Sequence, residues 1–165
     1  MTDNIHTTWP WIGGRPHPTP EAKTEDLTSP WDGELVSRVA MADAATIDAA
    51  IASAREAFEA NLHVTPAERA VWLRAAADEI EKERDTIADI TMRALGKPRR
   101  ACGVEIGRSI AFPRLCAEEL LRMEGDVLPL DALPMGKGRF GFTRHHPHGV
   151  IAAFTPFNAP SNLLM

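Results

Sequence analysis

The sequence predicts an α/β fold, and three observations lead to that prediction. Between residues 43 and 123, apolar side chains recur every three or four positions, which is the spacing of amphipathic helices. Short segments with alternating or aromatic residues precede this helical region. An uninterrupted apolar run, Val150–Phe154, follows it, and such a run is typical of a strand buried on both faces of a parallel sheet.

The N-terminal region is predicted to contain small β elements. Trp9–Gly14 has aromatic and β-branched residues before two glycines, which indicates a short strand that enters a turn. Arg15–Ser29 is rich in Pro, Glu and Thr, and we expect a surface loop there. A turn follows at Ser29–Gly33, where proline presets φ and glycine tolerates a positive φ. Glu34–Ala40 then alternates polar and apolar residues, as a short strand does.

Two helices are predicted next. The first begins near Asp43, a favourable N-cap, and its apolar stripe consists of Ile47, Ile51, Ala54 and Phe58. The second begins at the capping box that opens with Thr65 and ends at Gly96, as one helix of roughly 30 residues. Arg84 interrupts its stripe, which consists of Leu73, Ala77, Ile80, Ile87, Ile90 and Ala94.

A third helix is predicted over Arg100–Met123, with a stripe of Ile106, Ile110, Ala117 and Leu120. Pro113 lies inside it and should kink or break it, because proline removes a backbone donor. Gly125–Lys137 should be a loop, Gly138–His145 a strand, and Ser161–Met165 the first turn of another helix.

Composition and charge exclude several classes of protein. Lys and Arg number 18 and Asp and Glu number 23, so the net charge of −5 argues against a nucleic-acid partner. The longest apolar stretch is too short to cross a membrane, and the start of the chain has no signal-peptide pattern. Two cysteines are too few for a disulfide framework, so we expect a soluble, cytoplasmic protein with no membrane partner.

One polar residue follows the apolar run closely. Asn158 lies between two prolines, just after the expected strand, and ligands of open α/β sheets bind at the carboxyl ends of strands. Its neutral amide could donate a hydrogen bond to an oxyanion that develops when a carbonyl is attacked. The residue types alone favour a turn residue with no chemical role.

Several segments in order resemble the aldehyde dehydrogenase superfamily. The segment from Arg139 to Leu164 matches the family signature G-V-(apolar)-P-W/F-N-x-P, and the likeness extends from Trp9 to Met165. The upstream segments that match are W-I-G-G, S-P-W-D-G-E-L-V, I-D-A-A-I-A-S-A-R-E-A-F, P-A-E-R-A-x-W-L, A-A-D-E-I-E and A-L-G-K-P. The fold implied is the N-terminal part of such an enzyme: three long helices, an oligomerisation-arm strand and the first strand of a Rossmann-like cofactor domain.

The resemblance implies a role for each motif residue. In the family, a cysteine thiolate attacks the aldehyde, the motif asparagine donates to the oxyanion, and a hydride passes to the cofactor. Asn158 matches that catalytic asparagine. The cofactor, NAD or NADP, would lie against Phe154, Thr155, Pro156 and Phe157. The substrate tunnel would be lined by Ala159, Asn162 and Leu163, where the small Ala159 replaces a common aromatic residue.

The resemblance also implies an organisation for the chain. Residues 1–137 would form the N-terminal hairpin and the helices that belong to the cofactor-binding domain. Residues 138–147 would be the strand of an oligomerisation arm, and residues 148–165 the first cofactor-domain strand with the P-F-N loop. A homo-oligomer, either dimer or tetramer, and a small-molecule aldehyde are the partners that this implies for an intact protein.

The family's nucleophilic cysteine and its glutamate base lie beyond the motif, so we expect a chain truncated before both and inactive alone. Cys102 and Cys116 precede Asn158 and cannot replace the nucleophile, and Cys116 is expected to be a small core residue. The alternative is a non-catalytic fragment or interaction module that co-assembles with an intact aldehyde dehydrogenase.

A histidine cluster near the end of the chain invites a metal-site interpretation. His145, His146 and His148 lie close together, but a metal site needs ligands from more than one element. We therefore favour a solvated strand end, with no metal.

Overall fold

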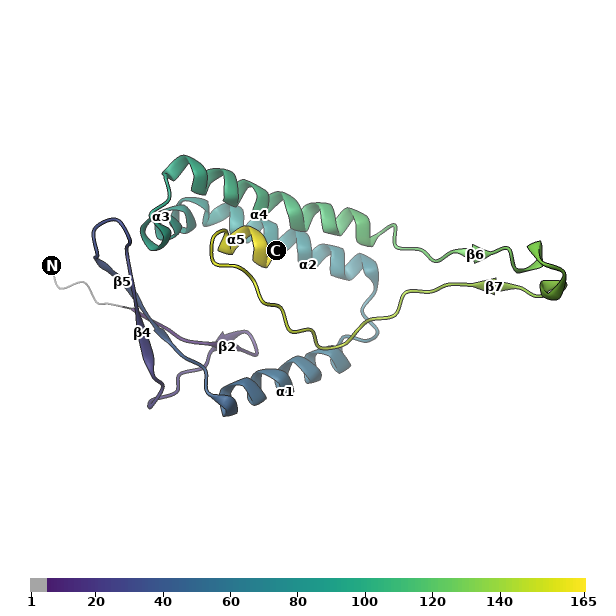
Figure 1. Ribbon diagram of the computed structural model, residues 1–165, viewed down its shortest axis with the longest axis horizontal. Coiled ribbons are helices and arrows are strands. Elements are labelled where there is room, and N and C mark those ends of the chain that lie inside the picture. The colour runs from purple at the N-terminus through teal and green to yellow at the C-terminus, as the bar shows by residue number, and fades with distance from the viewer. Residues whose placement is uncertain (1–5) are drawn as a thin grey trace.

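The computed structural model describes residues 6–165, so the first five residues of the predicted unit 1–137 lie outside the described part (Figure 1). Helices α2 (Pro66–Lys82), α3 (Arg84–Leu95) and α4 (Arg99–Leu120) form the body, and a small sheet lies at one of its ends. Helix α1 (Ala44–Ala60) lies below the body in Figure 1, and a thin two-stranded arm projects from the end opposite the sheet. The alternation of small strands and long helices agrees with the predicted α/β class.

The N-terminal sheet has the strand order β1-β5-β4. Strand β5 (Leu35–Ala40) pairs antiparallel with β4 (Thr24–Thr28) and parallel with β1 (Thr7–Thr8). The prediction of a strand at 34–40 is confirmed, but the prediction of a continuous loop over Arg15–Ser29 is wrong. Only one of the five residues of β4 is even half-buried, so this polar strand shows no alternation that the sequence could reveal.

A hairpin and a turn complete this region as the sequence predicts. Strands β2 (Trp11–Ile12) and β3 (Arg15–Pro16) pair antiparallel around two glycines. In the turn at 29–33, the amide of Gly33 donates to the carbonyl of Ser29 at 2.9 Å, and Gly33 has a φ of +77°. An L-residue rarely adopts that φ, which explains the glycine.

Helix α1 (Ala44–Ala60) begins where the sequence predicts. The carboxylate of Asp43 accepts hydrogen bonds from the backbone amide of Thr46 at 2.8 Å and from its hydroxyl at 2.7 Å. These bonds hold the pKa of Asp43 below its ordinary value. The predicted apolar stripe is not buried, since Ile47 is 50% exposed and Ile51 is 52% exposed.

The second predicted helix is two helices, α2 (Pro66–Lys82) and α3 (Arg84–Leu95). The capping box at Thr65 is present, with the Thr65 amide donating to Glu68 at 2.8 Å. The prediction of one continuous helix is wrong at Glu83, whose φ of −92° and ψ of 13° interrupt it. The break lets α2 pack on α4 while α3 contacts both α4 and strand β5, which one straight helix could not do.

Helix α3 ends as predicted at Gly96, which adopts a left-handed φ of +63° and donates to the carbonyl of Met92 at 2.9 Å. Helix α4 (Arg99–Leu120) then runs through Pro113 without a break, so of the predicted kink or break the break does not occur. Pro113 is buried on the face that packs toward the body, so packing offsets the one backbone hydrogen bond that proline removes.

The core lies between α2, α3 and α4, and its members are Ala77, Ala88, Cys102, Ile106 and Ile110. Ile106 and Ile110 belong to the stripe that the sequence predicts. Exposed ion pairs match the antiparallel register of α2 and α4, since Arg74 contacts Glu118 at 2.7 Å and Arg114 contacts Asp78 at 2.8 Å. Cys102 is fully buried and Cys116 only half-buried, so the core cysteine is not the one predicted.

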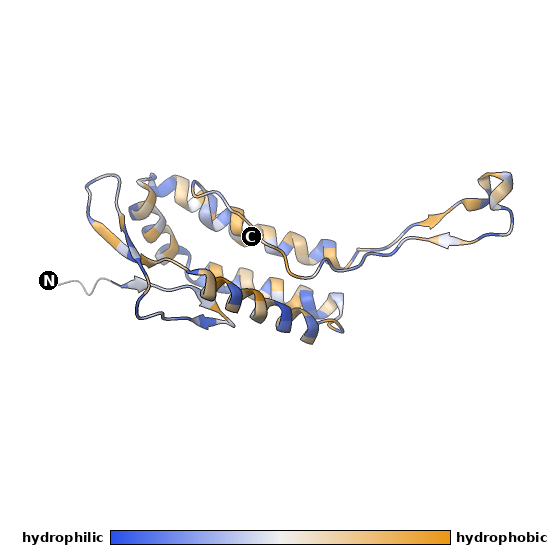
Figure 2. Ribbon diagram, turned by 60° about the horizontal axis from the view of Figure 1, so that its bottom comes forward, coloured by the Kyte–Doolittle hydropathy of each residue, from blue (hydrophilic) through white to orange (hydrophobic). Residues whose placement is uncertain are grey.

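The arm is built from β6 (Val127–Leu128) and β7 (Gly141–Phe142), which pair antiparallel. Two 3-10 turns, Leu130–Ala132 and Pro134–Gly136, form its tip. The region 125–137, predicted as loop, thus contains a strand, and the strand predicted over 138–145 is only two residues long. Figure 2 shows hydrophobic residues in the arm strands and at the tip.

After the arm, the chain returns along the body and ends beside α4 (Figure 1). The predicted strand at Val150–Phe154 is not formed, because a strand requires hydrogen-bonded neighbours and none of the described strands lies beside it. Ile151 is 72% exposed. The last element is the short helix α5 (Pro160–Leu164), which confirms the helical turn predicted at the end of the chain.

Candidate active-site segment

Asn158 lies in the turn that immediately precedes α5, and the residue is exposed. The ammonium group of Lys97 donates a hydrogen bond to the backbone carbonyl of Asn158. Lys97 belongs to the connection between α3 and α4, 61 positions earlier in the chain. Because this bond uses the backbone carbonyl, it leaves the side-chain amide of Asn158 free to donate elsewhere.

A buried carboxylate holds the other side of the same turn. Glu105 on α4 is only 6% exposed, and its Oε1 accepts from the amide of Ser161 at 3.2 Å and from its hydroxyl at 2.9 Å. Its Oε2 accepts from the ammonium of Lys97 at 2.7 Å. Burial raises the pKa of Glu105, but the bonds from Lys97 and Ser161 outweigh burial and leave that pKa below its ordinary value. Glu105 is therefore ionised near neutral pH.

The other predicted site residues form one continuous stretch around Asn158. Phe154 is 97% exposed and Phe157 is 83% exposed, and Thr155 and Pro156 between them are exposed as well. Ala159 and Asn162 are half-buried. The amide of Leu163 donates to the carbonyl of Ala159 at 3.0 Å, within the first turn of α5. The aromatic side chains thus present their surfaces outward, whereas Ala159 and Asn162 are partly covered and Leu163 is exposed.

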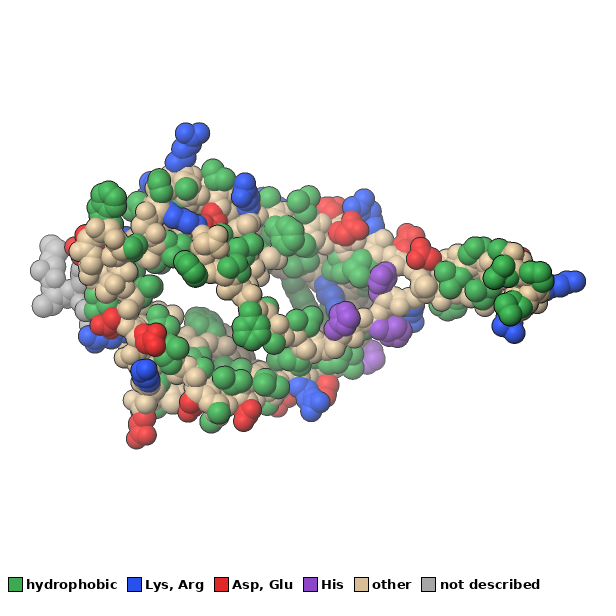
Figure 3. Space-filling view, in the orientation of Figure 1, with side chains coloured by type: hydrophobic (Ala, Val, Ile, Leu, Met, Phe, Trp, Pro, Cys, Tyr) green, Lys and Arg blue, Asp and Glu red, His purple; other side chains and the backbone are tan. Residues whose placement is uncertain are grey.

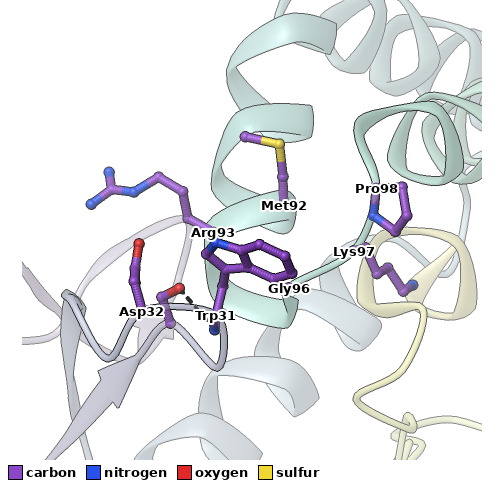
Figure 4. Close-up of a pocket in the computed structure, with 8 residues that line it drawn as sticks. Trp31, Asp32, Met92, Arg93, Gly96, Lys97 and Pro98 are labelled. Carbon is purple, nitrogen blue, oxygen red and sulfur yellow. Dashed lines mark hydrogen bonds between the residues drawn. The ribbon is translucent and has the colours of Figure 1, made fainter.

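A cavity of about 460 Å³ lies near the Lys97 connection, between the N-terminal sheet and α3 (Figure 4). It is lined by Ser29, Trp31, Asp32, Met92, Arg93, Gly96, Lys97 and Pro98. Figure 4 shows the Trp31 ring beneath Met92, whereas Lys97 points away from that ring toward the C-terminal segment. The amide of Glu34 donates to Asp32 at 3.0 Å and keeps the pKa of Asp32 below its ordinary value.

The histidines and the acidic residues give no metal centre. His145, His146 and His148 are exposed, at the base of the arm. Over residues 6–165, no group of three or more His, Cys, Asp or Glu side chains is arranged to hold a metal ion. Within the same residues, no helix combines the length and the apolar character that a bilayer-spanning segment needs.

The family assignment follows from comparison with known proteins. Residues 18–165 match the aldehyde dehydrogenase family over nearly the whole described chain, including the segment around Asn158. The chain belongs to the aldehyde dehydrogenase family. Its likeness to that family, which the motifs around Asn158 indicate, is thereby confirmed.

Individual members of the family are similar at moderate identity. The aldehyde-dehydrogenase-like protein y4uC of Sinorhizobium fredii is 36% identical over 136 residues, which are 82% of this chain and 27% of that protein. A vanillin dehydrogenase of Pseudomonas sp. is 33% identical over 151 residues, which are 90% of this chain and 30% of that enzyme. The chain spans between 27% and 32% of the length of the curated relatives that it matches.

Solved structures of aldehyde dehydrogenases share the fold. Aldehyde dehydrogenase 21 from Physcomitrella patens, in complex with the product succinate, has a TM-score of 0.89 at 27% identity, covering 97% of this chain and 33% of that one. PnpE in complex with nicotinamide adenine dinucleotide has a TM-score of 0.69 at 35% identity, covering 74% and 25%. The NADP-dependent glyceraldehyde-3-phosphate dehydrogenase from Bacillus halodurans, complexed with NADP, has a TM-score of 0.86 at 25% identity, covering 92% and 32%.

The sequence singled out Asn158 as a candidate site residue but did not indicate the residues that hold its turn. Glu105 lies at the edge of the buried face of α4, in line with Cys102 and Ser109 and one position before Ile106 of the predicted stripe. An acidic residue on an apolar helix face is a signal, because a buried carboxylate needs partners. The identity of those partners, Lys97 and Ser161, depends on how the chain returns from the arm, which no local pattern encodes.

Proposed function

We propose that this aldehyde dehydrogenase chain supplies the oxyanion donor for the oxidation of an aldehyde to a carboxylic acid. When a cysteine thiolate attacks the aldehyde carbon, negative charge develops on the carbonyl oxygen. The side-chain amide of Asn158 would donate to that oxygen and stabilise the charge. The observation that carries the proposal is the backbone anchoring of Asn158 by Lys97, since a fixed donor needs little reorganisation during the reaction.

The same segment would contact the cofactor, which accepts the hydride that leaves the aldehyde carbon. Phe154, Thr155, Pro156 and Phe157 fit this role because their surfaces are exposed and the backbone at 151–156 pairs with no described strand. The proposal includes both NAD and NADP, since structural neighbours hold one or the other.

The substrate is proposed to be a small-molecule aldehyde that approaches along α5. Ala159, Asn162 and Leu163 would line its tunnel, and the methyl side chain of Ala159 occupies little of that space. A wider tunnel or a more polar substrate is expected than in relatives with an aromatic residue at this position.

The 165 residues alone are proposed to be inactive. Cys102 is enclosed in the core and cannot reach a substrate, and Cys116 lies on α4, within the helical body. Without a nucleophile there is no covalent step, and one oxyanion donor contributes only about 3–4 kcal/mol of transition-state stabilisation.

The test is an assay of reduced-cofactor formation with NAD and with NADP. The purified 165-residue chain should give no turnover above background. A longer protein that carries this chain together with the family cysteine and glutamate should turn over aldehydes. In that protein, Asn158→Ala should lower kcat about 100- to 1,000-fold. An unchanged kcat in Asn158→Ala would refute the role assigned to this residue.

The arm favours a second candidate function, that of a module that assembles with other copies or with an intact relative. Its exposed apolar side chains include Val127 at 71%, Phe140 at 76% and Phe142 at 66% exposure. Figure 3 shows hydrophobic side chains covering much of the arm. A surface of this kind is typical of an interface, and we propose that it pairs copies into a dimer or tetramer.

Analytical ultracentrifugation of the 165-residue chain tests this candidate. Wild type should sediment as an oligomer, or as a complex when mixed with an intact aldehyde dehydrogenase, and Phe142→Ser should weaken both associations. A wild-type chain that stays monomeric in both experiments would refute the module.

A further inference from the structure

We propose that Glu105 is a positioning residue whose buried carboxylate, together with Lys97, fixes the turn that carries Asn158. The contacts themselves are independent of the proposed function, and only their consequence for aldehyde oxidation rests on it. The Glu105 carboxylate touches neither substrate nor cofactor in this proposal. It acts on the reaction only through the backbone of residues 158–161.

The buried carboxylate of Glu105 is fully hydrogen-bonded. Oε1 accepts from the backbone and hydroxyl of Ser161, and Oε2 accepts from Lys97, so both oxygens are satisfied. A buried carboxylate is stable only when it is paired and hydrogen-bonded in this way. Its partners come from two separate parts of the chain, which means that the carboxylate ties those parts together.

Lys97 binds both the Glu105 carboxylate and the turn that carries Asn158. Its ammonium group contacts Glu105 and the backbone carbonyl of Asn158 together, and its side chain is only 27% exposed. The turn is thus held on both sides of Ala159, at Asn158 through Lys97 and at Ser161 through Glu105. Two attachments three residues apart restrict both the position and the rotation of the Asn158 backbone.

Few other contacts hold the chain on either side of Asn158. The preceding residues 151–156 form no strand with the described chain, and Phe154 and Phe157 face outward. Helix α5 has only five residues, and helices this short are marginal without tertiary contacts. Besides the packing of α5 on α4, the contacts with Glu105 and Lys97 are therefore expected to provide most of the local stability of residues 157–164.

The test is hydrogen–deuterium exchange of the 165-residue chain, measured without substrate or cofactor. Ser161→Ala and Lys97→Met should each accelerate exchange in residues 157–164 about tenfold or more, with little change in α2. Lys97→Arg should restore slow exchange, because a guanidinium can donate to both Glu105 and the Asn158 carbonyl. Glu105→Gln should accelerate exchange in the same residues.

A matched control is Glu119→Gln, the same substitution at an exposed position of the same helix, which should change nothing in residues 157–164. Two outcomes would overturn the proposal: unchanged exchange in 157–164 for Ser161→Ala and Lys97→Met, or equal acceleration throughout the helical body. Failure of Lys97→Arg to restore slow exchange would also overturn it. If Glu105→Gln does not fold, the Ser161 and Lys97 variants still decide.

The outcome is separable from the proposed function. If hydrogen–deuterium exchange shows the attachment but Asn158→Ala leaves the turnover of the longer enzyme unchanged, only the oxyanion role is refuted. Conversely, loss of turnover in Asn158→Ala with no exchange effect of Ser161→Ala and Lys97→Met would leave the oxyanion role intact and refute the attachment.

Discussion

Substitution of Gly96 by alanine should destabilise the chain through two separable effects. Gly96 has a φ of +63°, and alanine in the left-handed region costs about 1–2 kcal/mol. Alanine also lowers the conformational entropy of the unfolded chain, which stabilises the folded state by about 0.4–1 kcal/mol. A Cβ at this position would lie 2.9 Å from Cγ of Pro30, so either the Pro30 ring or the end of α3 must shift. Overpacking of this kind costs about 1–3 kcal/mol.

The total expected for Gly96→Ala is about 2–4 kcal/mol of unfolding free energy, from the sum of these contributions. Gly33→Ala is the matched control, because Gly33 has a φ of +77° but nothing within 4 Å of a new Cβ. It should lose only the conformational part, about 1 kcal/mol. Urea unfolding followed by far-ultraviolet circular dichroism measures both losses, and an unchanged m value shows that the unfolded state is comparable.

A double-variant cycle with Pro30→Ala separates strain from the close contact. Removal of the Pro30 ring should recover most of the difference between Gly96→Ala and Gly33→Ala, as a coupling energy. If Gly96→Ala costs no more unfolding free energy than Gly33→Ala, or if Pro30→Ala gives no coupling energy, the close packing of Gly96 on Pro30 is refuted.

Three further changes test the body and the attachment of the Asn158 turn. Ile106→Ala should cost about 2–5 kcal/mol and Ile106→Val about 0.5–1.5 kcal/mol in the same unfolding experiment, since Ile106 is fully buried; equal costs would contradict that burial. Thr65→Ala should cost about 1 kcal/mol and Thr65→Ser much less, because serine keeps the capping oxygen; a neutral Thr65→Ala would exclude the capping box. The folded-state pKa of Glu105 is lowered, so its contribution to stability is complete above its ordinary value of 4.5 and is lost as pH falls through the folded pKa. Unfolding free energy should thus fall less steeply below pH 4.5 in Glu105→Gln than in wild type, and identical pH profiles would argue against an ionised Glu105.

Features encoded by neighbouring residues could be predicted from the sequence. The starts of α1 and α2 follow from Asp43 and Thr65, whose side chains cap backbone amides only three residues away. The end of α3 follows from Gly96, because its left-handed conformation needs no partner elsewhere. The buried stripe of α4 was predictable for the same reason, since its periodicity is set within one helix.

Features that depend on distant partners were predicted less well. Glutamate is not a helix-breaking residue, so the sequence does not mark the break at Glu83. The break accompanies the packing of α3 on both α4 and β5. Val150–Phe154 has the composition of a buried strand, yet a strand forms only beside a neighbour that offers unpaired backbone groups. Composition reports what a segment can do, whereas the partner determines whether it does so.

The candidate site combines both kinds of feature. Asn158 could be proposed as a site residue from the sequence, because its chemistry and its place after an apolar run are local properties of the motif. The anchoring of its backbone could not be predicted, because the arm separates Glu105 and Lys97 from the turn along the chain. Glu105 lies one position before Ile106, about 100° around the helix, so the buried face of α4 is wider than the predicted stripe. Because a buried carboxylate must be paired, the partners of Glu105, which are Lys97 and Ser161, show where the C-terminal segment docks on α4.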